Sequence, residues 1–350
     1  MAEEAQDRVL ERALEAYGLA GAVVVPLRRG LIHLTFSLEH SGDAYILQRV
    51  SPSFSRGIHE NIAAVTEHLV ARGVTSPRLV RTPGGELFAD LGEQGRWRLM
   101  TRLPGVAFDR CHSLEQVRAA GALLAEFHGA LLDLDAELHP VGFPFHDMPL
   151  HLADLRRALA VHADHRHRAA VGELADAIFS AVERWDDIGD VPARVIHGDP
   201  KFNNLLFVGE APGERERGVG LIDLDTLARL PLYVDLGDAW RSWCNGRRED
   251  ESDAELDLSI FRASAEGYLG EFPVQLAREE LASLAHGLER IALELSARFA
   301  ADALEECYFG WDRDRFEAAG DHNLARARGQ LALARQAEVT REERLRFLCG

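Results

Sequence analysis

The chain has 350 residues, of which 47% are hydrophobic and 27% charged, a composition typical of a folded globular protein rather than a disordered or fibrous one. Its 57 acidic and 39 basic residues give a net charge of −18, which argues against a nucleic-acid partner because such binding needs a basic face. The four cysteines are scattered without a Cys-x-x-Cys pair, and no apolar run approaches the ~20 residues of a membrane span. We therefore expect a cytoplasmic protein without a zinc site, a disulfide framework or a membrane partner.

The first hundred residues predict a small lobe of mixed strands and helices. Apolar residues at helical spacing indicate a helix over 3–18, and helical periodicity returns over 57–72. Gly-containing turns at Arg29-Gly30 and Ser41-Gly42-Asp43 separate apolar runs that favour strands. The predicted strands cover residues 22–27, 32–39, 44–50, 78–81, 86–89 and 96–102. The lobe is expected to end near Pro104-Gly105.

The rest of the chain is mainly helical in pattern. A block at 194–225 interrupts it with short apolar strands, and Asp235 and Asp238 are expected to precede a helix that contains tryptophan. The other predicted helices cover residues 113–132, 149–163, 169–187, 252–269, 276–305 and 321–346. The sequence thus predicts an α+β protein with a strand-rich lobe at 1–102 and a large, mainly helical lobe at 103–350.

The stretch from Val195 to Asn204 is the most informative part of the chain. It joins a buried apolar run to His197, Asp199 and Asn204, and a second apolar run ends in Asp223. Phosphoryl transfer from a metal–nucleotide needs one carboxylate to orient and deprotonate the attacking hydroxyl. It also needs an amide oxygen and a second carboxylate to hold the metal. The pattern therefore predicts Asp199 as the catalytic base.

Lys201 is the second candidate catalytic residue. It is the only lysine in the chain, and it lies two residues beyond Asp199. A compact ammonium at that position would reach a transferring phosphoryl group.

Oxygen-bearing side chains near the predicted base are the candidate metal ligands. Asn204 and Asp223 fit Mg²⁺, which takes oxygen ligands and only one or two carboxylates. Asp225 is a third candidate, which touches metal or substrate or else fixes the loop. His197 is expected to hydrogen-bond the loop backbone, and Asp235 to cap a helix or anchor the catalytic loop.

These motifs resemble those of the aminoglycoside phosphotransferase/choline kinase family, small-molecule relatives of the protein kinases. The likeness begins with His197-Gly198-Asp199, Asn204 and Ile222–Asp225 and extends along nearly the whole chain. Within the family, several segments resemble the N-acetylhexosamine 1-kinases. They are residues 30–36, 45–50, 60–62, 145–149, 222–226, 294–299, 308–309 and 322–328. The resemblance implies a two-lobed protein-kinase-like fold that uses ATP and Mg²⁺.

The resemblance also implies where the nucleotide binds. Met100, Thr101 and Arg102 lie where the hinge of a two-lobed kinase presents backbone groups to adenine. Kinases usually place a phosphate-gripping lysine on the third strand, and here that position is Gln48. The subgroup carries Gln there too, so Arg49 or another arginine is expected to supply the charge.

Candidate acceptor contacts are carried over in the same way. Arg298 and Tyr308 match subgroup positions associated with the sugar pocket, although a helix-surface ion pair and a core aromatic explain them almost as well. His33 is a third candidate; here Leu31-Ile32-His33 replaces the usual His-Ile-Asn of the subgroup.

The leading expectation is a small-molecule kinase that phosphorylates a sugar hydroxyl with ATP and Mg²⁺. The alternative acceptors are an amino alcohol, a homoserine-like compound or an aminoglycoside. A catalytically silent nucleotide-binding module is the alternative from another class, motivated by Gln48. The intact Asp199, Asn204 and Asp223 argue against it.

Overall fold

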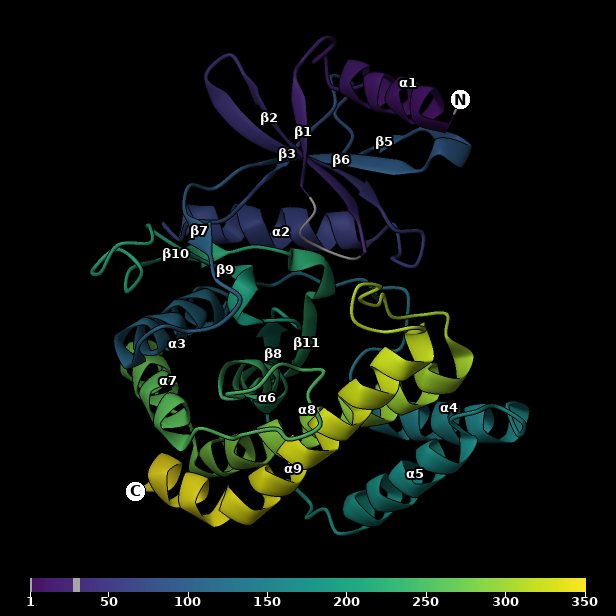
Figure 1. The fold of residues 1–350 in the computed structure, drawn as a ribbon. Coiled ribbons are helices and arrows are strands. Elements are labelled where there is room, and N and C mark those ends of the chain that lie inside the picture. Colours follow the sequence, from purple (N-terminus) through teal and green to yellow (C-terminus); the bar gives the residue numbers. More distant parts are fainter. Residues whose placement is uncertain (1, 28–31) are drawn as a thin grey trace.

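A computed structural model describes residues 2–27 and 32–350 and shows a strand-rich lobe above a larger helical lobe (Figure 1). The predicted turn at Arg29-Gly30 lies outside the described residues. Within the described residues, no helix combines the length and apolar character needed to cross a membrane.

One antiparallel sheet forms the smaller lobe. Its strands run in the order β1-β2-β3-β6-β4, and β5 also pairs with β6. The bounds are β1 Val24–Leu27, β2 Leu34–His40, β3 Asp43–Val50, β4 Leu79–Val80, β5 Ala89–Asp90 and β6 Arg96–Thr101. Helix α1 (Ala2–Glu15) contributes Ala13 and Leu14 to a core with Phe36 and Trp97 of the sheet. The strand predicted over 86–89 is wrong for its first three residues, and only its last residue, Ala89, lies in a strand, β5.

The β2–β3 hairpin confirms its predicted turn. Ser41 and Gly42 both have positive φ, of 54° and 89°, and His40 pairs with Asp43. A two-residue turn of this kind matches the twist of the strands it joins, which sets the pairing register. The hairpin therefore fixes which residues of β3 face the rest of the molecule.

Helix α2 (Ile58–Ala71) connects the two lobes. Its apolar residues Ile62, Val65 and Leu69 belong to the core of the helical lobe. The amide of Asn61 also exchanges two hydrogen bonds with the backbone of His139, at 2.8 and 2.7 Å. Because these residues of α2 pack into the helical lobe, the hydrophobic core of that lobe extends to the helix of the smaller lobe.

The helical lobe confirms most of the predicted helices within a few residues. Its helices are α3 Leu114–Ala130, α4 Met148–Val161, α5 Arg168–Glu183, α6 Leu232–Trp243, α7 Leu258–Glu271, α8 Arg278–Glu305 and α9 Ala319–Cys349. Its short strands are β7 Val106–Ala107, β8 Ala193–Ile196, β9 Leu205–Phe207, β10 Gly218–Leu221 and β11 Ala228–Pro231. Strand β7 pairs with β9, and the lobe boundary at residue 102 stays a prediction.

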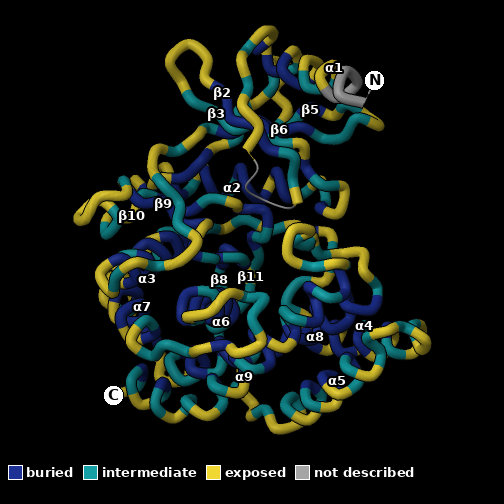
Figure 2. Tube along the Cα trace, viewed as in Figure 1, coloured by how far each residue is buried: buried dark blue, intermediate teal, exposed yellow. Residues whose placement is uncertain are grey.

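Two helix starts differ from the prediction. Helix α6 begins at Leu232, so Asp235 and Asp238 lie inside it rather than before it, and the helix is buried along most of its length (Figure 2). Helix α7 begins six residues later than expected because Asp257 caps it, accepting hydrogen bonds from the amides of Ser259 and Ile260.

Glycines set the contact between α3 and α7. A Cβ on Gly121 would lie 2.1 Å from the carbonyl oxygen of Ser264, and one on Gly267 would lie 2.0 Å from that of Arg118. Real Cβ atoms do not approach so closely, so the two helices pack backbone to backbone here. Gly270, also in α7, has no neighbouring atom within 4 Å of such a Cβ.

We predict that Gly267→Ala destabilises the protein whereas Gly270→Ala does not. The first change forces α3 and α7 apart, at a cost of about 1–3 kcal/mol in the free energy of unfolding. The second gains up to about 1 kcal/mol because alanine favours helix more than glycine does. Urea unfolding of both variants measures this difference. A Gly267→Ala protein as stable as Gly270→Ala would contradict the packing described.

Candidate active site

The predicted catalytic loop lies between β8 and β9, at the side of the helical lobe that faces the sheet (Figure 1). It reaches β9 through the short 3-10 helix η2 (Phe202–Asn204). Gly198 has φ of 89°, and a Cβ there would lie 2.4 Å from the carbonyl oxygen of Thr226. Only glycine therefore allows the loop to pass so close to the neighbouring turn.

Asp235 anchors this loop from below. Its carboxylate accepts hydrogen bonds from the amides of His197 (2.9 Å) and Gly198 (2.6 Å). His128 of α3 lies 2.8 Å from the same carboxylate, and both side chains are fully buried. Burial opposes the negative charge, but the bonds from His128 and the loop hold the pKa of Asp235 below its ordinary value. The geometry is that expected of a loop anchor.

His197 also has the geometry of the predicted scaffold residue. Its Nδ1 accepts from the amide of Asp199 at 3.3 Å, so the Nε2–H donates to the carbonyl of Ile222 at 2.9 Å. Both ring nitrogens are thus used to join the loop to the segment after β10. The ring ties the predicted base to the predicted metal-binding segment.

Asp199 and Lys201 form an ion pair of 2.8 Å between Oδ2 and Nζ. Burial raises the pKa of Asp199 to about 6, Lys201 opposes that shift, and Asp238 and Asp223 add to it. Asp199 also raises the pKa of Lys201, which keeps the ammonium charged. The pair thus combines a proton acceptor with a fixed cation.

Asn204 and Asp223 offer oxygens suited to a divalent cation. The Asn204 amide nitrogen donates to the Asp199 carbonyl at 2.8 Å, which reserves the amide oxygen for another partner. Asp223 is exposed and has a left-handed conformation, with φ of 66° and ψ of 57°. The backbone of Asn204 accepts from Ile222 at 2.9 Å, which brings the two segments together. One carboxylate with one amide oxygen is a donor set that fits Mg²⁺.

Asp225 differs from these two residues because protein groups occupy its carboxylate. Arg98 of β6 binds both carboxylate oxygens, and His33 Nε2 lies 2.6 Å from Oδ2. His33 in turn accepts from the amide of Ser51 at 3.0 Å. The structure therefore places two predicted site residues, His33 and Asp225, in one buried network with Arg98.

Gln48 and Arg49 lie on opposite faces of β3, since side chains alternate along a strand. Gln48 faces inward and accepts from Arg98 at 2.9 and 2.7 Å. Arg49 is exposed, and its guanidinium lies beside Gly95. Of the arginines that the expectation allowed, the one beside Gln48 is therefore Arg98, and a role of either arginine toward the phosphates stays a prediction.

The predicted hinge residues lie at the end of β6. Met100 is buried, and the backbone of Thr101 donates to the carbonyl of Arg78 at 2.9 Å. The backbone of Arg102 donates to Ala44, and its guanidinium to Ser37 at 3.2 Å. An adenine contact at this hinge stays a prediction.

The predicted acceptor contacts Arg298 and Tyr308 lie close together. The Arg298 guanidinium carbon is 5.8 Å from the Tyr308 ring centre and 5.5 Å from that of Phe309. Tyr308 is half exposed, at 51%. A cation stacked on aromatic faces is held in place without losing its hydrogen-bond donors. Contact with an acceptor stays a prediction for both residues.

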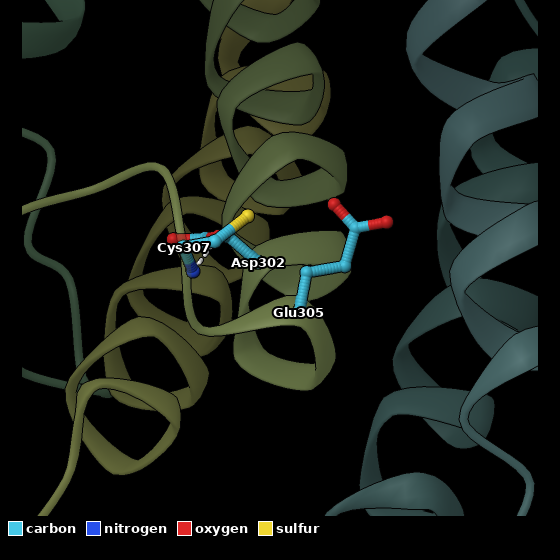
Figure 3. Close-up of side chains that lie close together, drawn as sticks. All are labelled: Asp302, Glu305 and Cys307. Atoms are coloured by element: carbon cyan, nitrogen blue, oxygen red, sulfur yellow. Dashed lines mark hydrogen bonds between the residues drawn. The ribbon is translucent and has the colours of Figure 1, made fainter.

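Asp302, Glu305 and Cys307 lie close together just before this loop (Figure 3). Asp302 accepts from the amides of Cys307, Tyr308 and Phe309 at 2.8–3.0 Å. Glu305 pairs with Arg157 of α4 at 2.8 Å. The carboxylates are thus occupied by the protein, and the cluster anchors the Tyr308 loop.

Sequence reasoning missed Arg98, His128 and Asp302. Arg98 lies in a short strand that also contains Arg96, and the sequence does not distinguish the one arginine from the other. His128 and Asp302 lie in helices as isolated polar residues among apolar ones. A polar residue on an otherwise apolar helix face is the one signal that could have indicated the last two.

Comparisons with known proteins agree with this geometry. The model of the phosphotransferase enzyme family (APH) matches residues 23–269. A homoserine kinase from Granulibacter bethesdensis is 29% identical over 272 residues, which are 76% of this chain and 77% of that protein.

Two solved structures are similar over almost their full length. A microcompartment-associated aminopropanol kinase has a TM-score of 0.65 at 19% identity, covering 97% of this chain and 99% of its own. An amicoumacin kinase in complex with AMP-PNP, Ca²⁺ and Ami has a TM-score of 0.61 at 16% identity, covering 95% and 96%. At these identities the likeness concerns the fold, and it confirms the expected two-lobed protein-kinase-like architecture.

We predict that Asp235→Asn costs about 3–5 kcal/mol of stability at neutral pH, because one amide oxygen cannot serve the loop amides and His128 as a carboxylate does. A depressed pKa stabilises the fold above the unfolded value of 3.8, and this contribution is lost as pH falls through the folded pKa.

The stability gap between wild type and Asp235→Asn should therefore stay constant from about pH 7 to about pH 5 and narrow from there to about pH 3. Urea unfolding across this range measures the gap. A gap that is constant or widens with acid would show that the charge of Asp235 contributes nothing.

Proposed function

Because the chain belongs to the phosphotransferase enzyme family, we propose that it transfers the γ-phosphoryl group of ATP to the hydroxyl of a small amino alcohol of the homoserine type. The observation that carries the transfer chemistry is the loop in which Asp199, paired with Lys201, lies beside Asn204 and Asp223. The comparisons favour this acceptor class, which was the alternative, over the sugar expected from the N-acetylhexosamine 1-kinase likeness.

Asp199 acts as the proton acceptor. Its side chain is 29% exposed, so an incoming hydroxyl can reach it. The raised pKa increases its basicity while it remains deprotonated at neutral pH. The hydroxyl proton moves to the Asp199 carboxylate as the oxygen attacks the γ-phosphorus and the bond to the leaving ADP breaks.

Lys201 stabilises the negative charge of the transferred group. Its side chain is 41% exposed, and its Nζ lies 2.8 Å from the base. The ammonium therefore stands near the attacking hydroxyl and the transferring phosphoryl at the same time. An interaction that strengthens as charge develops lowers the barrier rather than only binding substrate.

A divalent cation, proposed to be Mg²⁺, would be held by Asp223 and the amide oxygen of Asn204. When bound, such a cation would neutralise the negative charge that develops on the phosphate group. The residues fit this role because the Asn204 nitrogen is committed to Asp199, and Asp223 is exposed. Asp225, the third predicted ligand, already gives both oxygens to Arg98 and His33.

The relatives named above favour an acceptor that carries an amino group, because homoserine and aminopropanol are both amino alcohols. Arg298, held over the Tyr308 loop, would bind the carboxylate that distinguishes homoserine from a simple amino alcohol.

We predict that Asp199→Asn lowers kcat by about 10²–10⁴-fold and leaves ATP affinity nearly unchanged, because it removes the base and keeps the shape. Steady-state kinetics and nucleotide binding measure the two effects. Asp176→Asn, an exposed change in α5, is the matched control and should behave as wild type. Near-normal turnover of Asp199→Asn would refute the assignment.

We also predict an order among acceptors. Homoserine should have a higher kcat/KM than 1-amino-2-propanol, and N-acetylglucosamine the lowest. Arg298→Gln should raise KM for homoserine about tenfold or more and leave 1-amino-2-propanol unaffected, because only homoserine carries a carboxylate. A coupled assay of ADP release measures both. Preference for the hexosamine would overturn the proposed acceptor class.

A further inference from the structure

We propose that Arg98 positions the cation site: from its place beside Gln48 on the sheet it binds Asp225, and so sets the segment that presents Asp223 to the nucleotide-bound cation. The proposal rests on the nucleotide and cation binding proposed above, and it adds a residue that those motifs do not contain. Arg98 is a positioning residue, since it acts through Asp225 rather than on the reacting atoms.

The register of the sheet places Arg98 directly beside Gln48, the residue at the position of the usual third-strand lysine. Gln48 of β3 and Arg98 of β6 are direct partners across the two strands, so both side chains lie on the same face at the same height. Gln48 Oε1 accepts from Nε and Nη2 of Arg98, and Gln48 Nε2 donates to Thr35 Oγ1 at 3.2 Å. The positive charge in this part of the sheet thus lies on β6 instead of β3, and Gln48 orients the Arg98 guanidinium.

The contact with Asp225 joins the two lobes. Nη1 and Nη2 of Arg98 bind the two oxygens of Asp225, the second at 2.8 Å, and the side chains are only 2% and 3% exposed. A fork-to-fork pair of this kind fixes orientation as well as distance. Thr226, next in the chain, donates to the carbonyl of His197 at 3.0 Å. The pair therefore connects the sheet to the catalytic loop.

Asp223 lies two residues before Asp225 and takes a left-handed conformation at the start of the 3-10 helix η3 (Leu224–Thr226). A non-glycine residue keeps such a conformation only where its surroundings determine it. The bonds to Asp225 supply that constraint from one side.

The test measures ATP binding by calorimetry with and without Mg²⁺, which needs no acceptor. Arg98→Gln and Asp225→Asn should each weaken ATP binding about 10–100-fold in the presence of Mg²⁺ and change Mg²⁺-free binding little. The double variant should lose no more than either single one, because both changes break one link. Arg98→Lys keeps the charge without the fork and should recover part of the loss.

A second variant separates positioning from folding. Arg98→Gln leaves His33 as the remaining partner of the buried Asp225 carboxylate, which destabilises the protein. Arg98→Met with Asp225→Leu replaces the pair by apolar groups and should restore most of the lost midpoint of thermal unfolding. The weak Mg²⁺-dependent ATP binding should persist in this stable protein. Arg341→Gln, which breaks a partly buried pair with Glu289 between α9 and α8, is the matched control and should bind ATP as wild type does.

Wild-type Mg²⁺-dependent binding in the stable apolar variant would overturn the inference, and so would an equal loss with and without Mg²⁺. Absence of Mg²⁺-dependent ATP binding in the wild type would overturn it as well. If binding follows the expected pattern but no amino alcohol is phosphorylated, the proposed acceptor fails and the role of Arg98 stands.

Discussion

The buried carboxylate of Asp235 is the contact on which the catalytic loop depends. Two consecutive loop amides, of His197 and Gly198, turn away from any strand partner and would be unsatisfied without it. An unpaired buried N–H costs about as much as a lost hydrogen bond, so the loop cannot keep its path if the carboxylate is removed. Because Asp235 lies in α6, a helix that is buried along most of its length, the loop that carries the proposed base Asp199 is held by the core of the lobe.

From this anchor the site is assembled by short links between segments. His197 joins the loop to Ile222, and the Asn204 backbone accepts from the same segment. The sheet then adds its own contact through Arg98 and Asp225. Each link joins groups that are distant in sequence. Together the links fix the positions of the proposed base, the proposed cation ligands and the sheet relative to one another. Helix α2 supports it by sharing the core of the helical lobe.

Two cationic side chains, Lys201 and Arg98, supply positive charge around the proposed reaction centre. The single lysine lies beside the base, and a buried arginine takes the place of a lysine on the sheet. Arginine suits the second position because its planar fork can bind Asp225 and Gln48 at once, which an ammonium cannot do with the same geometry. The net negative charge of the chain is therefore compatible with the proposed phosphoryl transfer, since one cation lies beside the proposed base and another is paired within the protein.

The sequence by itself determined the elements and the chemistry that depend on neighbours in the chain. Apolar spacing predicted most helices, Ser41-Gly42 predicted the hairpin, and the residues from His197 to Asn204 indicated phosphoryl transfer. These features are local, because helix periodicity, turn conformation and a loop between two strands involve only nearby residues.

Only the tertiary structure decided which polar residues work together. Arg98 and Asp225 are 127 positions apart, and the strand pattern does not distinguish Arg98 from Arg49. The start of α6 was also misplaced, because its first turn contains an aspartate that belongs to the loop above it. Such contacts arise when the sheet register and helix packing bring distant side chains together, and no local pattern records that geometry.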